Sequence, residues 1–148
     1  MLNYLKVIFV CFLFCCLGCT HDDLNRASVS GIVTLNGKPL EKGTIAWLPL
    51  HNEGPTIGCD IRNGKYSIPK KSGPAVGEYL VAIKGEPVPT GKKVPSGMNS
   101  SVMVDELVDP VPEKYRSGNM SEKHPESTLK VTISSGKNVH DFTLNSDP

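Results

Sequence analysis

The fold is decided by residues 28–37, which read SVSGIVTLNG. Within this stretch, positions 29, 31, 33 and 35 hold Val, Gly, Val and Leu, and mostly polar residues lie between them. A period of two is typical of a strand that buries one face. The Asn36-Gly37 pair that follows favours a tight hairpin turn, because both residues tolerate positive φ. The stretch therefore predicts a β-strand that enters a hairpin.

The same period returns along the rest of the chain. It is seen at residues 44–47, 57–62, 66–68, 77–84, 128–133 and 138–144, and a second Asn-Gly pair, Asn63-Gly64, separates two of these runs. No stretch after residue 28 combines helical periodicity with capping residues over twelve positions. About seven strands of this kind predict an all-β fold, with two antiparallel sheets stacked as a sandwich.

Bulk composition narrows the classes of protein to consider. The chain has 148 residues, a length typical of one domain, with 14 Gly and 12 Pro to supply turns. Its formal net charge is +1, so the composition does not indicate the strongly basic surface that is typical of nucleic-acid-binding proteins. Four of the five cysteines lie in the first 19 residues, which leaves Cys59 as a lone thiol that we expect to pack as a small hydrophobe.

One segment breaks the alternation. Residues 86–127 are rich in Pro, Gly, Ser and charge, and we expect an irregular insert there, either functional or disordered. Residues 102–108 within it have the pattern of a short strand or a helical turn.

The N-terminus has the pattern of an export signal. Lys6 precedes an apolar run of eleven residues, Val7 to Leu17. A helix of that length spans about 16 Å, which is too short for a bilayer core of roughly 30 Å. Residues 1–18 are therefore predicted to be a cleaved signal peptide.

The run ends in Leu17-Gly18-Cys19, which resembles the lipobox of bacterial lipoproteins. The resemblance implies cleavage before Cys19, lipidation of its thiol and a polar tether over residues 19–27. It also implies a protein of the cell envelope, anchored on the exported side at an outer membrane or cell surface. An ordinary signal peptide with a chance cysteine is the alternative.

The body resembles the carboxypeptidase regulatory-like domain found in small bacterial lipoproteins. The matching pieces are residues 31–40, 43–49, 63–67, 77–83, 111–115, 127–129 and 136–144, and His140 stands where the relatives have an aromatic or apolar residue. The resemblance implies an immunoglobulin-like or transthyretin-like sandwich over residues 28–148. It implies no activity, because the domain accompanies enzymes and does not itself cleave peptides.

Catalytic and cofactor motifs are missing from the sequence. The four histidines, His21, His51, His124 and His140, lack the spacing of a zinc site. No serine-nucleophile elbow or phosphate-binding loop occurs, and Gly91-Lys92-Lys93 is interpreted as a solvated basic patch. We therefore predict no catalytic, cofactor-binding or metal-binding residue, with Cys19 as the only modification site.

Two groups of residues keep alternatives open. The carboxylates Asp105, Glu106, Asp109 and Glu113 could supply oxygens to a cation, although an exposed acidic stretch is the simpler interpretation. The aromatic residues Trp47, Tyr66, Tyr79 and Tyr115 could form a sugar-stacking platform. Alternation turns Trp47 and Tyr79 inward, which favours core packing.

These features leave three functions open. The expected one is a non-enzymatic envelope lipoprotein, a structural or protein-interaction module whose partners are a membrane, through its lipid anchor, and an envelope protein or glycan. The second is a carbohydrate-binding module at the cell surface. The third is a hydrolase or metal-dependent enzyme built on the long segment, which would need His124 or the acidic residues to converge with a second group.

Overall fold

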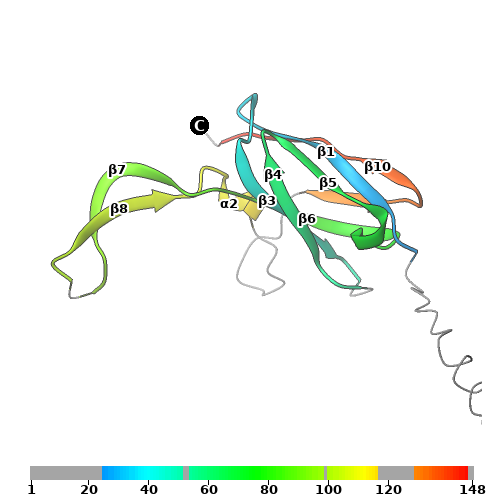
Figure 1. Cartoon of the computed structure of the whole chain (residues 1–148), viewed down its shortest axis with the longest axis horizontal. Helices are drawn as coiled ribbons and strands as arrows, with labels where there is room; N and C mark the ends of the chain where they lie inside the picture. The colour runs from blue at the N-terminus through cyan, green and yellow to red at the C-terminus, as the bar shows by residue number, and fades with distance from the viewer. Residues whose placement is uncertain (1–24, 52–53, 99, 117–128, 147–148) are drawn as a thin grey trace, which may run out of the picture.

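The chain folds as an all-β, sandwich-like body with one projecting arm (Figure 1). The computed structural model describes residues 25–51, 54–98, 100–116 and 129–146. Its strands are β1 (Ser28–Leu35), β2 (Lys38–Pro39), β3 (Lys42–Pro49), β4 (Ile57–Arg62), β5 (Lys65–Ile68), β6 (Gly77–Gly85), β7 (Val88–Pro95), β8 (Met103–Val108), β9 (Lys130–Ile133), β10 (Lys137–Val139) and β11 (Phe142–Leu144). A 3₁₀ turn, η1 (Lys70–Ser72), and a short helix, α2 (Glu113–Arg116), complete the described elements.

The body is one curled sheet with the strand order β10-β1-β5-β4-β3-β6-β9, and β2 and β11 also pair with β1. Most pairings are antiparallel, as predicted. The C-terminal run differs, because it divides at His140-Asp141 into β10 and β11 and both pieces run parallel to β1. The first strand is therefore flanked by the antiparallel β5 on one side and by the end of the chain on the other.

Both predicted hairpins are confirmed. Asn36 and Gly37 have φ of 51° and 76°, and Asn63 and Gly64 have φ of 50° and 72°. Two consecutive residues at positive φ match the twist of the strands that they join. The registers Leu35↔Lys38 and Arg62↔Lys65 show that each loop has two residues.

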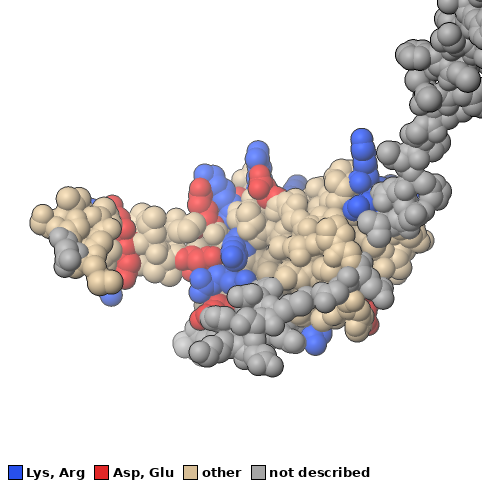
Figure 2. All heavy atoms as spheres, turned by 90° about the horizontal axis from the view of Figure 1, so that it is seen from below, with Lys and Arg blue, Asp and Glu red and all other residues tan. Residues whose placement is uncertain are grey.

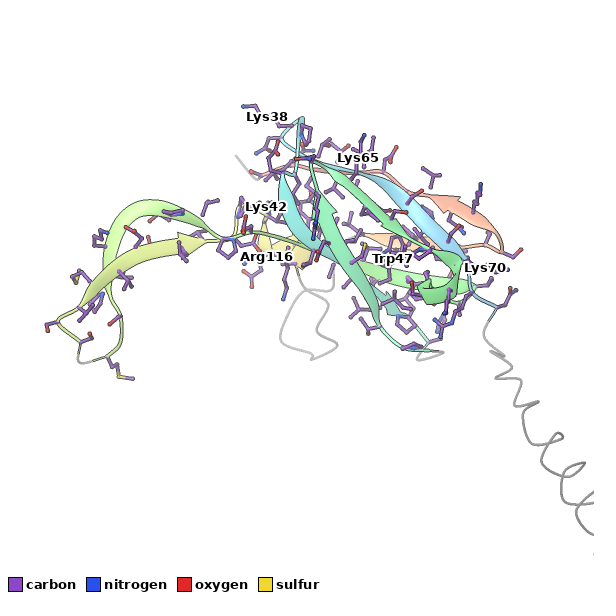
Figure 3. All side chains as sticks on the ribbon, in the orientation of Figure 1. Lys38, Lys42, Trp47, Lys65, Lys70 and Arg116 are labelled. Atoms are coloured by element: carbon purple, nitrogen blue, oxygen red, sulfur yellow. The ribbon has the colours of Figure 1, made fainter. Side chains whose placement is uncertain are left out.

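The core lies inside the curl and uses the predicted faces. Trp47, Ile45, Ile83 and Ile133 are completely buried, and Trp47 lies 6.1 Å from both the Tyr66 and the Phe142 rings, centroid to centroid. Figure 3 shows Trp47 inside the body, between the facing strands. One face of β6 was predicted to be buried, but Leu80 and Ala82 on its other face are buried as well.

The folded body begins before β1. Ala27 is completely buried and donates its N–H to the Pro74 carbonyl at 2.9 Å, while Arg26 forms a β-bridge with Ala75. The last two residues of the predicted tether are thus part of the body. No helix in the described part of the chain is long and apolar enough to cross a membrane.

The prediction of an irregular insert over residues 86–127 was wrong for much of its length. β7 and β8 pair in a two-stranded antiparallel sheet of their own, and α2 follows it. The pairing could not be seen in the sequence of β7, which contains two prolines and one glycine, because two extra residues bulge between Pro89 and Lys93 and interrupt the alternation. The part of the insert at residues 117–128 lies outside the described residues.

Candidate functional site

The histidines are not brought together. His51 is exposed, with its Nε2 atom 3.5 Å from Glu78 Oε2, whereas the His140 ring lies against Trp47 in the core, at 5.9 Å between centroids. The Nε2 atom of His140 and the Nε1 atom of Trp47 are buried without a hydrogen-bond partner among the described residues. His21, His124 and the predicted lipidation site Cys19 lie outside the described residues.

The acidic residues of the insert serve separate structural contacts. Asp105 forms a 2.7 Å ion pair with Lys93, and Glu106 accepts a 2.7 Å hydrogen bond from the Thr90 hydroxyl. Asp109 Oδ1 accepts the N–H groups of Gly85 at 2.9 Å and Val111 at 2.8 Å. Within the described ranges, no three His, Cys, Asp or Glu side chains are grouped so that they could hold a metal ion.

The four aromatic residues considered for sugar stacking are all buried. Trp47 is 0% exposed, Tyr79 2%, Tyr66 4% and Tyr115 8%. Tyr66 donates its hydroxyl to the His140 carbonyl at 2.7 Å, and Tyr79 donates to the Ala75 carbonyl at 3.0 Å. Burial raises the pKa of both phenols. These side chains support the core and form no exposed platform.

Cys59 is a free, half-buried thiol that packs against the core from β4. Burial raises its pKa above the ordinary value, which keeps the thiol protonated and weakens it as a nucleophile. The expectation that Cys59 packs as a small hydrophobe agrees with this environment.

A shallow groove of about 610 Å³ lies where the arm joins the body, lined by β3, β4 and residues 85–87. Four of its five charged side chains form two ion pairs: Lys42 lies 3.1 Å from Glu86, and Arg62 lies 3.0 Å from Asp60, while Glu41 is the fifth. Such mutually neutralised pairs offer little to a charged ligand.

The arm, defined as β7, β8 and the turn between them (residues 88–108), is the most distinctive surface. It contains seven of the ten large hydrophobic side chains that are exposed among the described residues. These are Val88, Met98, Val102, Met103, Val104, Leu107 and Val108. Exposed apolar surface gathered on one element, and not scattered singly, marks an interaction site.

The register of the arm sorts its side chains onto two faces. Val88 pairs with Val108 and Val94 with Val104, and alternation adds Val102 to the same side. We name these five residues the valine face; the Thr90–Glu106 hydrogen bond is its polar contact. The opposite face has the Lys93–Asp105 ion pair together with Pro89, Pro95, Met103 and Leu107.

The root of the arm is fixed to the body. The Asp109 carboxylate connects the end of β6 to the end of the arm through its two hydrogen bonds. A Cβ on Gly85 would lie 2.7 Å from Pro110 Cγ, so the chain entering the arm and the chain leaving it pack closely here. The arm thus leaves the body from a defined base.

The sequence offered a short strand or a helical turn at residues 102–108, and the structure has the strand β8 there, but β7 and its pairing with β8 were missed. Val102, Val104 and Val108 follow the period of two within the insert, but their partners on β7 are separated by the bulge.

Comparison of the chain with protein-family models, with curated proteins and with solved structures finds no match.

Proposed function

We propose that the chain is an exported lipoprotein, held in a membrane by lipid on Cys19, whose β-sandwich presents the arm to another envelope protein. The role is non-enzymatic. In this proposal the body is a carboxypeptidase regulatory-like domain of transthyretin-like type, which the all-β architecture and the two Asn-Gly hairpins support. The observation that carries the proposal is the valine face of the arm, four of whose five side chains are exposed in the part of the chain that the structure describes.

Energetics favour a partner for the arm. A two-stranded ribbon is marginally stable in water by itself, and three strands or a packed face are normally needed. The valine face would gain roughly 25 cal/mol for each Å² of apolar surface that a partner covers. Its β-branched side chains are stiff, so little side-chain entropy opposes their ordering in an interface.

The position of the arm also supports this role. In Figure 1 the arm extends from one end of the body, and β1 begins at the other end. A lipid anchor that precedes β1 would therefore hold the membrane at one end and leave the arm directed away from it. Figure 2 shows the arm as largely uncharged surface crossed by one band of acidic side chains.

The anchor is tested by Cys19→Ser in the full chain. We expect the wild-type protein in the membrane fraction, with a mass that includes acyl groups on a chain beginning at Cys19. The variant should move to the soluble exported fraction. A wild-type protein that begins at Met1 with an unmodified thiol would refute the anchor.

The arm is tested by placing a photo-cross-linking amino acid at Val104, on the valine face, in intact cells. A matched control places the same probe at Leu107, which is on the same strand but on the opposite face and is also exposed. We expect one discrete protein adduct from position 104 and none from position 107. Equal adducts from both positions, or none from either, would contradict the proposal.

A further inference from the structure

Three segments meet at the end of the body where β1 begins. The Ala27 N–H donates to the Pro74 carbonyl at 2.9 Å, and the Ser28 N–H donates to the Gly136 carbonyl at 3.0 Å. Arg26 Nη1 donates to the Gly73 carbonyl at 2.9 Å, and Lys137 is the register partner of Ser28. These bonds fix the start of β1, the η1 region and the β9–β10 turn side by side.

Positive charge predominates at this end. Arg26, Lys70, Lys71 and Lys137, here called the basic end, belong to it, and the three lysines are exposed. Residues 25–28, 68–77 and 133–138, all of which the structure describes, contain no Asp or Glu, and the nearest acidic residue along these segments, Glu78, lies 3.5 Å from His51. Blue side chains stand at the end of the body away from the arm in Figure 2, and Figure 3 labels Lys70 there.

The opposite end of the body differs in charge. Lys38, Lys42 and Lys65 lie there in Figure 3, but Glu41, Asp60 and Glu86 accompany them. The chain has a formal net charge of only +1. The excess of positive charge, carried by the exposed Lys70, Lys71 and Lys137, is therefore a property of one end and not of the whole surface.

An apolar side chain accompanies the charge. Val76 is 42% exposed, and its N–H donates to the Asn25 carbonyl at 3.0 Å, which holds it beside the start of the body. Basic side chains around an exposed apolar residue are suited to a membrane interface, where lysines contact headgroups and the apolar group enters between them.

We infer that the basic end is a docking surface for anionic lipid headgroups. This inference rests on the proposed membrane anchoring, since a lipid on Cys19 would bring this end to the bilayer. Basic residues near an anionic leaflet are each attracted by its surface potential within about a Debye length. Docking would hold the body against the bilayer and keep the arm directed outward.

The test uses the unlipidated chain from Thr20 onward, so that lipid attachment plays no part. Every residue of the core cluster lies between Ala27 and Leu144, so this chain contains the whole folded body. It also retains Asp22 and Asp23, whose charge opposes binding. We expect flotation with vesicles of equal phosphatidylglycerol and phosphatidylcholine at 50 mM salt, and no flotation with phosphatidylcholine alone or at 500 mM salt.

Two double variants with the same net charge distinguish binding through the basic end from an effect of the overall charge of the chain. Lys70→Glu/Lys71→Glu should lower the partition coefficient on anionic vesicles at least tenfold. Lys38→Glu/Lys65→Glu, at the opposite end, should leave it within twofold of the parent. An equal loss in both variants, or no flotation of the parent chain, would overturn the inference.

Failure here is distinguishable from failure of the proposed function. If Cys19→Ser leaves the protein membrane-bound in cells, or if the wild-type chain is unmodified, the anchor itself is wrong. If the anchor holds and the anionic vesicles fail to bind the chain from Thr20, only the docking surface is wrong.

Discussion

At Gly31, a close contact with a residue far away in the sequence leaves no room for a side chain. A Cβ at this position would collide with the His140 carbonyl and would lie 3.0 Å from the Tyr66 hydroxyl. The same carbonyl accepts the Tyr66 hydrogen bond, and the next residue, Asp141, accepts the Ile32 N–H at 2.7 Å. The backbone at His140-Asp141, between β10 and β11, thus packs directly against Gly31 of β1.

We predict that Gly31→Ala destabilises the fold by about 1–3 kcal/mol, because the backbone at His140 has to move to admit the methyl group. Urea unfolding followed by tryptophan fluorescence measures the change, since the single tryptophan, Trp47, is in the core. Gly97→Ala is the control: nothing lies within 4 Å of its Cβ position, so its unfolding midpoint should not move. Equal midpoints for the two variants would contradict the collision.

Tyr66→Phe should cost about 1–3 kcal/mol at pH 7, because it leaves the His140 carbonyl without this donor inside the protein. The pKa of Tyr66 is raised by burial and then by the negative charges of Asp141 and Cys59. The protonated phenol is therefore favoured in the fold. Its stabilisation is complete below the unfolded pKa of about 10 and is lost as the pH rises above it.

Measuring the free energy of unfolding between pH 8 and 11 tests whether stability falls as the pH rises. The wild-type curve should fall above pH 10, and the Tyr66→Phe curve should fall less steeply. Parallel curves would show that Tyr66 ionises as freely in the fold as in the unfolded chain. Burial also raises the pKa of Tyr79 and of Cys59, so the unfolding free energy of the Tyr66→Phe variant should still fall to some extent at high pH.

Among the elements, the alternating strands were predictable and the arm was not. Val29, Val33, Ile45 and Trp47 occupy the expected inward positions because a period of two leaves no other face for them. The arm pairs two stretches of unequal length across a bulge, so neither strand predicts its partner. The parallel pairing of β10 and β11 with β1 is equally hidden, since no local turn specifies it.

Asp109 should control the rigidity of the arm's root. We predict that Asp109→Ala increases the hydrogen-exchange rates of the Gly85 and Val111 amides at least tenfold, because both lose their acceptor. Asp109→Asn keeps an oxygen at the same position and should exchange like the wild type. Rates for the alanine variant that match the wild type would show that the carboxylate does not hold the root.

The arm should be separable from the body. Val88 and Val108 are paired partners, so an Asn-Gly turn can replace residues 89–107 and join them directly. No residue of the core cluster lies in the removed segment. We expect a soluble protein whose Tm is within about 5 °C of the wild type by circular dichroism. Unfolding of this variant at room temperature would show that the arm stabilises the body.

For the whole molecule, the sequence predicted a β-sandwich body with an irregular insert, and the structure shows a body whose two ends differ in charge and in exposed apolar surface. The basic end could not be recognised in the sequence, because Arg26, Lys70 and Lys137 are far apart along the chain and meet only after folding. The arm end was hidden by its proline and glycine content. The candidate lipid site at Cys19 depends on local sequence alone, and it stays a prediction.

The parallel pairing of β1 with β10 and β11 constrains when the protein can fold. Val29 lies beside Asn138 and Leu35 beside Leu144, so the first strand acquires this neighbour only after a further hundred or so residues have been synthesised. While the ribosome is still translating, β1 has no β10 or β11 to cover it, and contacts between such distant residues form slowly. If the predicted signal peptide directs export during synthesis, β1 would cross the membrane before β10 and β11 were available to cover it.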